Sequence, residues 1–122
     1  MTWDELTEKQ KVEVAPAPRA PLEARRPADV LEFVHRLPGG SAQRLTATIG
    51  RFEDGRIAEI FIDPPKLSND FANLARDVAV IISIALQHGV SIAELSHSIG
   101  RSEDGTPQSI AGSALDLLAA EG

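Results

Sequence analysis

The side chains in this 122-residue chain whose types and spacing suggest chemistry are three histidines and a few carboxylates. His88 and His97 flank a short segment that contains Glu94, so these side chains could approach one another around a metal ion. Their spacing matches no established metal-binding motif, and a histidine at a helix end is favoured by the helix dipole alone. His35 stands apart from both. We therefore predict no metal site and no bound cofactor.

Two acidic pairs, Glu53 with Asp54 and Glu103 with Asp104, could serve as general acid and base. Each pair precedes a glycine, as in a solvent-exposed turn, so we interpret both pairs as loop residues. The sequence contains no phosphate-binding glycine loop, zinc-protease motif or nucleophile elbow. It contains no cysteine, which excludes disulfides, thiolate metal sites and thiyl-radical chemistry within the chain. We predict no catalytic residue.

The composition indicates a small acidic protein with an aliphatic core. Hydrophobic residues make up 43% of the chain but aromatic residues only 4%, so Leu, Ile, Val and Ala must fill the interior. A net charge of -6 disfavours nonspecific binding to the nucleic-acid backbone. The first residues lack the pattern of a signal peptide, and no apolar run approaches the roughly 18 residues that span a bilayer. We expect a cytoplasmic protein without membrane contact.

Residues 1–27 differ in composition from the remainder of the chain. They contain four of the eight prolines and balanced charges, so they cannot bury enough apolar surface to offset the entropy of ordering. We predict a flexible tail over residues 1–27 and a single domain over residues 28–122. The tail is interpreted as a passive linker, and the alternative is a docking arm anchored by Trp3 and Leu6.

The clearest structural pattern is a β-hairpin. Asp54 and Gly55 separate two runs of alternating residues, which predicts a two-residue type I′ turn. This turn would pair Phe52 with Ile57, Gly50 with Glu59 and Thr48 with Phe61. Residues 31–37 also alternate and predict a third antiparallel strand. One face of the hairpin is uniformly aliphatic and is expected to face the core; it contains Leu45, Ala47, Ile49, Ala58, Ile60 and Ile62.

The opposite face of this hairpin is more apolar than a sheet surface exposed to water normally is. It contains Phe52, Ile57 and Phe61 beside Thr48 and Glu59. Contiguous apolar patches on small proteins usually mark contacts, so we predict that these five residues contact a second copy of the chain in a homodimer. The alternative is that the tail or the predicted third strand folds across this face.

A long helix follows the sheet. Ser68 or Asn69 can cap its start, and it runs to about His88, with Gly89 as the residue that ends it. Between residues 78 and 86 it is apolar almost all round, which predicts a central helix covered on more than one side.

Two shorter helices complete the fold. Ser91 and Glu94 form a capping box that begins a helix over residues 92–99, and Pro107 opens the last helix. The predicted fold class is α+β, with a small antiparallel β-sheet of two or three strands packed on a long buried helix and two shorter helices.

Residues 85–99 also resemble a helix-turn-helix, which would make the protein a DNA-binding regulator. The expected recognition helix contains Glu94 and no Lys or Arg, so it lacks the phosphate contacts that supply much of the affinity for DNA. We keep this function, and that of a small-ligand sensor, as alternatives.

A seven-residue motif occurs twice, as IGRFEDG at 49–55 and IGRSEDG at 99–105. The flanking sequences differ, so we interpret the motif as two uses of one turn chemistry rather than an internal duplication.

Three stretches resemble one protein family. They are FEDGRIAEIFI at 52–62, ISIALQHGVSIAEL at 82–95 and SIAGSALDLL at 109–118. In this order they are similar to the C-terminal accessory region, the TSCPD domain, of adenosylcobalamin-dependent (class II) ribonucleotide reductases. The likeness extends over roughly residues 25–119.

The resemblance implies an accessory role rather than reductase activity. The chain lacks the large catalytic barrel and the cysteines of these enzymes, so no catalytic or cobalamin-binding residue has a counterpart here. We expect a free-standing, non-catalytic interaction module that associates with itself or with a reductase in deoxyribonucleotide metabolism.

Overall fold

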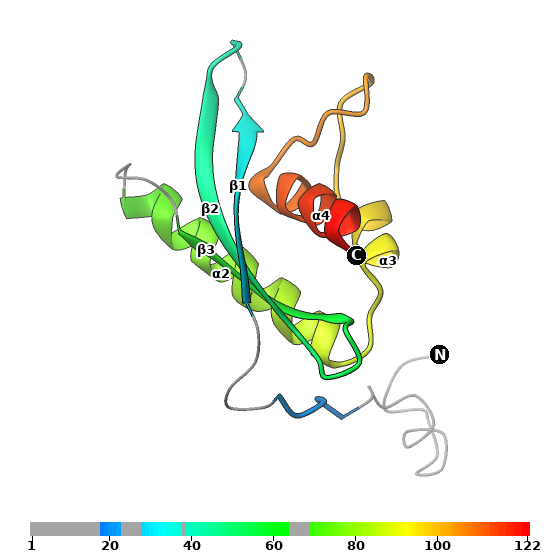
Figure 1. Cartoon of the computed structure of the whole chain (residues 1–122). Coiled ribbons are helices and arrows are strands. Elements are labelled where there is room, and N and C mark those ends of the chain that lie inside the picture. The colour runs from blue at the N-terminus through cyan, green and yellow to red at the C-terminus, as the bar shows by residue number, and fades with distance from the viewer. Residues whose placement is uncertain (1–17, 23–27, 38, 64–68) are drawn as a thin grey trace, which may run out of the picture.

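The computed structural model describes residues 18–22, 28–37, 39–63 and 69–122. Within these ranges the chain forms a three-stranded antiparallel sheet and three helices, so the fold class is α+β as predicted (Figure 1). The predicted third strand is present at the start of the sheet. The elements are β1 (Ala28–Arg36), β2 (Ala42–Arg51), β3 (Ile57–Asp63), α2 (Asn69–Gln87), α3 (Ile92–Ser98) and α4 (Ile110–Glu121).

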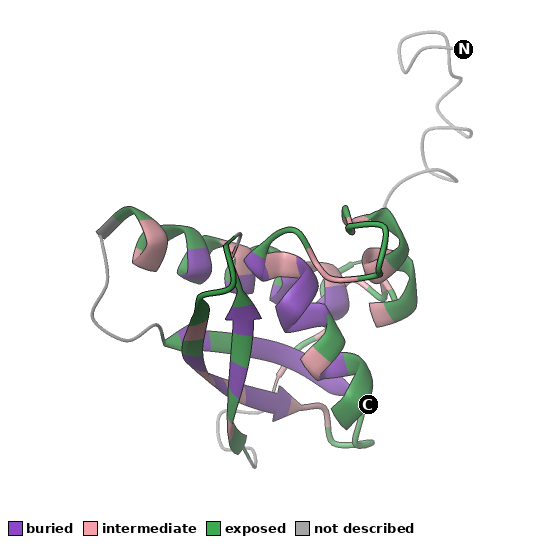
Figure 2. Ribbon diagram, turned by 90° about the horizontal axis from the view of Figure 1, so that it is seen from above, coloured by how far each residue is buried: buried purple, intermediate pink, exposed green. Residues whose placement is uncertain are grey.

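The sheet has the strand order β1-β2-β3, so β2 is central and the other two strands are its edges. The alternation of the strands sends one set of side chains toward α2 and α4, and the buried sides of both helices face the sheet (Figure 2). The predicted core face is confirmed, because all six of its members are at most 4% exposed. They pack with residues from β1 and both helices, including Phe33, Ala79, Ile82, Leu115 and Leu118.

The loop of the β2–β3 hairpin differs from the predicted two-residue turn. The N–H of Phe52 donates to the C=O of Arg56 (2.8 Å), and the N–H of Gly55 donates to the C=O of Phe52 (2.9 Å). The loop therefore contains three residues, of which only Gly55 has a positive φ (92°). A type I′ turn would have required positive φ at Asp54 as well, which is costly for a residue with a side chain. Instead the Asp54 carboxylate accepts from the N–H of Arg56 (3.0 Å).

A β-bulge next to this loop restores the predicted register farther along the hairpin. Arg51 pairs with Ile57, but Gly50 pairs with Glu59, so Ala58 is an additional residue on β3. The predicted pairing of Gly50 with Glu59 is confirmed, whereas that of Phe52 with Ile57 is wrong. The shift turns Ile57 into the core, where it is 7% exposed.

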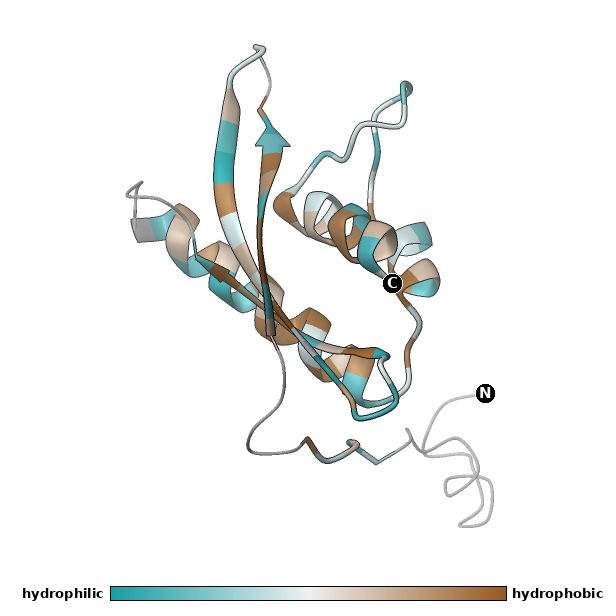
Figure 3. Ribbon diagram, viewed as in Figure 1, coloured by the Kyte–Doolittle hydropathy of each residue, from teal (hydrophilic) through white to brown (hydrophobic). Residues whose placement is uncertain are grey.

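Helix α2 is buried on one side only. Ala79 and Ile82 pack into the core, whereas Val80 and Ile81 are 55% and 66% exposed. The prediction of a helix covered on more than one side is therefore wrong for the single chain, because no described element packs on its outer side. Figure 3 shows that hydrophobic residues nevertheless continue through much of α2.

The two shorter helices begin at different signals. The N–H of Glu94 donates to the Ser91 hydroxyl (3.0 Å), which confirms Ser91 as the cap of α3. Helix α4 begins at Ile110 instead of Pro107, because Pro107 forms an isolated antiparallel bridge with Arg101 and is thereby held outside the helix.

The described residues 18–22 lie against the end of α2. The N–H of Ala20 donates to the C=O of Gln87 (2.8 Å), and the Arg19 side chain donates to the side-chain carbonyl of Gln87. The division into a tail over 1–27 and a domain over 28–122 stays a prediction. Trp3 and Leu6 lie outside the described residues.

Candidate interaction site

The five residues predicted to contact a partner do not form one surface. Thr48, Glu59 and Phe61 lie together on the outer face of the sheet, which points away from the core. Ile57 is buried in the core, so its assignment to an exposed contact surface is corrected, and the cause is the bulge at Gly50. The role of the remaining residues as a contact stays a prediction.

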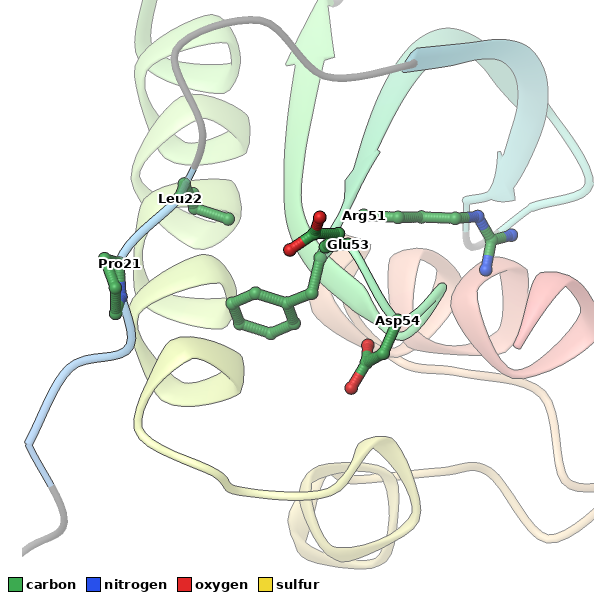
Figure 4. Close-up of a pocket in the computed structure, with 6 residues that line it drawn as sticks. Pro21, Leu22, Arg51, Glu53 and Asp54 are labelled. Carbon is green, nitrogen blue, oxygen red and sulfur yellow. The ribbon is translucent and has the colours of Figure 1, made fainter.

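Phe52 lies at the hairpin loop and contacts its own chain. Its ring lies 4.9 Å from the Arg56 guanidinium, measured to the ring centroid. Its carbonyl and N–H are both used by the loop. A shallow pocket of about 550 Å³ lies beside it, between the hairpin and the segment before β1 (Figure 4). The pocket is lined by Pro21, Leu22, Arg51, Phe52, Glu53 and Asp54.

On the outer face of the sheet, one row of residues crosses all three strands. Val30 is opposite Thr48, and Thr48 is opposite Phe61. Val30 is 66% exposed and Phe61 57% exposed, so the row presents two large apolar side chains to solvent.

Phe61 also lines a groove of about 600 Å³ between β3 and α2. The large apolar side chains that α2 contributes to this groove are Val80 and Ile84, which lie four residues apart and therefore on one side of the helix. Arg76 and Asp63 also line it, together with Arg19, Thr48, Glu59, Ser83 and Gln87. The groove thus combines an apolar lining with charges of both signs.

Glu59 is a buried carboxylate at this groove. It is 7% exposed and its side chain lies directly over Gly50, where an added Cβ atom would be 2.5 Å from its Oε1. The absence of a side chain at Gly50 makes the space for Glu59. The sequence pattern gave no signal for this contact beyond the predicted pairing of the two residues.

Exposed apolar side chains are concentrated on one part of the molecule. Among the described residues, seven large hydrophobic side chains are exposed, and all lie on the outer face of the sheet or the solvent side of α2. We call these seven residues together with Thr48 the open face. The seven are Val30, Val34, Phe61, Leu74, Val80, Ile81 and Ile84.

Sequence reasoning missed the contribution of α2 to the open face. The signal is the apolar stretch of residues 78–86, but apolar residue types alone do not distinguish burial within the chain from contact with another chain. Ile81 and Ile84, three residues apart, are neighbours on the helix surface and extend the apolar area from the groove around α2.

The three histidines lie in different parts of the fold, on β1, directly after α2 and on α3. Within the described residues, no three His, Asp or Glu side chains are arranged to hold a metal ion. His35 is buried and its Nδ1 lies 2.8 Å from the Ser113 hydroxyl, so β1 and α4 are joined by a polar contact. Burial lowers the pKa of His35 from its ordinary value of 6.5.

The twice-occurring motif forms the same loop at both places. Gly105 has a φ of 87°, and its N–H donates to the C=O of Ser102 (2.9 Å), as Gly55 does in the hairpin. The Arg101 guanidinium donates to the C=O of Gly105 (3.2 Å), and the corresponding contact in the hairpin is 2.9 Å.

The aspartates of both loops have a structural role. Asp104 accepts hydrogen bonds from Thr106, and Asp54 accepts hydrogen bonds from Arg56, so the pKa of each carboxyl group is lowered. These bonds hold the carboxylates within their own turns.

A short turn connects α2 to α3, which is the arrangement that a helix-turn-helix requires. Helix α3 has no buried residue and contains Glu94 in its first turn. DNA binding stays an untested alternative.

None of the described helices has the length and apolar character needed to cross a membrane.

Comparison with known proteins decides the family. The family model of the TSCPD domain matches residues 17–120. The chain belongs to the TSCPD domain family. This TSCPD domain is 47% identical over 45 residues to a vitamin B12-dependent ribonucleotide reductase from Agrobacterium fabrum. The matched stretch is 37% of this chain but only 4% of the reductase, and no solved structure matches the chain.

Proposed function

We propose that this TSCPD domain is a non-catalytic interaction module that pairs with a second copy of itself through the open face. The observation that carries the proposal is that all seven exposed large apolar side chains of the described residues lie on the outer face of the sheet or the solvent side of α2, two surfaces that meet at the groove lined by Phe61, Val80 and Ile84. A small protein that keeps such a surface in contact with water normally uses it for binding.

The apolar area is large enough to contribute substantially to association. Full burial of a Val, Leu, Ile or Phe side chain contributes about 1.5–3 kcal/mol. About half of each of the seven side chains is still exposed, so their burial would supply roughly 5–10 kcal/mol per copy. The two copies together would supply roughly 10–20 kcal/mol, against an estimated cost of about 4–15 kcal/mol for one association event.

A second copy is the favoured occupant because a closed two-fold dimer is the commonest assembly of a soluble chain. Arg76 and Asp63 give the groove both signs of charge, which supports contact with an identical surface. The likeness to a segment of a reductase supports the other occupant, a ribonucleotide reductase in deoxyribonucleotide metabolism. The cysteine-free, acidic composition supports a cytoplasmic location and an accessory rather than a catalytic role.

The experiment compares Phe61→Glu and Ile84→Glu with the unchanged chain by light scattering at about 10 µM, a concentration at which only a contact of micromolar or tighter affinity persists. Ala119→Glu, which adds the same charge to the exposed side of α4, is the matched control. We expect the unchanged chain and the control to be dimers and both open-face variants to be folded monomers.

Two results would contradict self-association through the open face. One is a dimer that persists in both open-face variants. The other is an unchanged chain that is monomeric at this concentration. If that monomer binds a purified vitamin B12-dependent reductase and Phe61→Glu does not, the open face is a reductase contact instead.

A further inference from the structure

The two edge strands of the sheet differ in whether their outward backbone groups are hydrogen-bonded. On β3, the backbone N–H and C=O of Ile60 are within hydrogen-bond distance of the Ser83 hydroxyl (2.9 and 3.1 Å). The Gln87 side chain donates to the C=O of Ala58 (3.1 Å). Two side chains of α2 therefore occupy the outward-pointing backbone groups of Ala58 and Ile60, so this part of the β3 edge is closed to another strand.

The hydrogen bonding of β1 shows which of its residues face the other edge. The N–H of Leu37 donates to the C=O of Ser41 (2.8 Å), and these residues continue the β1–β2 register. In an antiparallel pair, hydrogen-bonded and non-bonded positions alternate. Glu32, Val34 and Arg36 therefore point their N–H and C=O groups away from β2, toward the free edge.

Within the described part of the chain, no hydrogen bond reaches these outward groups of β1. The strand is nine residues long and contains no proline or lysine, and its outward charges, Glu32 and Arg36, are of opposite sign and can pair between two copies. The side chains of Glu32, Val34 and Arg36 are all exposed. Such an edge is a template for another strand.

We infer that the free edge of β1 pairs with β1 of a second copy, antiparallel and with Val34 on the two-fold axis. In this register Glu32 lies opposite the partner's Arg36, and Arg36 opposite the partner's Glu32. Val34 lies opposite the partner's Val34. Directly opposed residues of antiparallel strands lie about 4.5–5.5 Å apart at Cβ, so the two ion pairs and the valine pair form direct contacts.

The side chains select this register over its neighbours. A shift of the axis to Phe33 places Glu32 opposite Val34 and Val30 opposite Arg36. A shift to Glu32 places two like charges opposite each other, which is destabilising. Of these three registers, only the one centred on Val34 matches opposite charges with each other and apolar with apolar.

This edge contact uses the outward backbone groups of β1 and shares only Val34 with the open face, so Phe61→Glu and Glu32→Arg disturb the two contacts separately. It involves three residue pairs and about six backbone hydrogen bonds, so it is a small interface and is expected to bind weakly, at about millimolar concentration. Because the two contacts form in different concentration ranges, they can be measured independently on the same chain.

The experiment measures molecular mass by sedimentation at about 10 µM and about 1 mM, which brackets weak binding. The variants are Glu32→Arg, Arg36→Glu and the charge-exchanged double variant with both changes. Glu103→Arg, on the exposed loop before α4, is the control for the added charge. We expect each single variant to lose the millimolar association step, by a factor of about ten or more in affinity, while circular dichroism stays unchanged.

The double variant distinguishes strand pairing from a general effect of charge. It recreates both ion pairs with their signs reversed, so it should recover the millimolar step, as should a mixture of the two single variants. The inference is overturned if the unchanged chain shows no millimolar step, if the single variants keep it, or if the double variant fails to recover it. Phe61→Glu should remove only the micromolar step, so failure of the open-face proposal would be seen separately.

Discussion

The hydroxyl of Ser83 accepts a hydrogen bond from the N–H of Ile60 (2.9 Å) and lies 3.1 Å from the C=O of the same residue. It is also 2.8 Å from the C=O of Ala79, so its single hydrogen serves one carbonyl at a time. Ile60 is 1% exposed and Ser83 8% exposed, so water does not replace these bonds. One polar side chain in an apolar helix thus joins α2 to the edge of the sheet.

Replacing Ser83 with alanine should destabilise the domain by about 1–3 kcal/mol, because the buried N–H of Ile60 loses its acceptor. Urea unfolding followed by circular dichroism measures this change. Ser98→Ala is the control, since Ser98 is an exposed helical serine that bonds only to the C=O of Glu94. Equal stability of the two variants would show that the Ser83 contact contributes nothing.

Neighbouring positions of α2 should respond in opposite ways to a carboxylate. Ile82 is 5% exposed and Ile81 is 66% exposed. Ile82→Asp buries an unpaired charge at a cost of several kcal/mol, comparable with the total stability of a small domain, so this variant should not fold. Ile81→Asp should melt cooperatively within about 5 °C of the unchanged chain. A folded Ile82→Asp protein would contradict the assigned buried side of the helix.

The close packing of Glu59 on Gly50 predicts a coupled pair of substitutions. Gly50→Ala should cost about 1–3 kcal/mol, because the added methyl group overlaps the Glu59 side chain. In a Glu59→Ala background the same change should cost less, since the overlapping atoms are gone. A double-mutant cycle by urea unfolding gives the coupling energy. A coupling energy near zero would place the Glu59 side chain elsewhere.

Buried His35 predicts a loss of stability in mild acid. Its pKa is lowered in the folded chain, so the unfolded chain binds more protons below about pH 6.5. The free energy of unfolding should therefore fall as the pH drops below about 6.5, and level off below the folded pKa.

Urea unfolding at about pH 7.5 and about pH 5 measures this effect. His35→Gln should weaken the dependence in that window, because the titrating ring is removed. His97→Gln, at an exposed position on α3, is the control and should preserve it. A pH dependence that is the same in all three proteins would show that His35 is not its source.

The sheet could be predicted from the sequence because alternation has a period of two and one face is buried. Leu45 and Ile49 are therefore placed correctly without knowledge of the rest of the chain. The conformation of the loop could not be predicted, since Asp54 and Gly55 fit both a two-residue turn and a three-residue loop with a bulge. That one-residue difference decides whether Ile57 is a surface residue or a core residue.

The exposure of one side of α2 could not be predicted for a different reason. An apolar side chain such as Ile81 indicates contact with other apolar atoms, but its type does not say whether they belong to the same chain. Pro107 shows the same limit at short range, because proline is compatible with the first turn of a helix and with an extended bridge.

The contacts of Ser83 and Gln87 with β3 also limit how far the sheet can grow when copies pair edge to edge. A sheet with two free edges can add strand after strand and grow into a fibril. Here α2 occupies the Ala58 and Ile60 positions of one edge, so a second copy that joins at β1 presents another covered β3 at the far side. The long helix therefore blocks the addition of further strands, and edge pairing of this sheet stops at six strands.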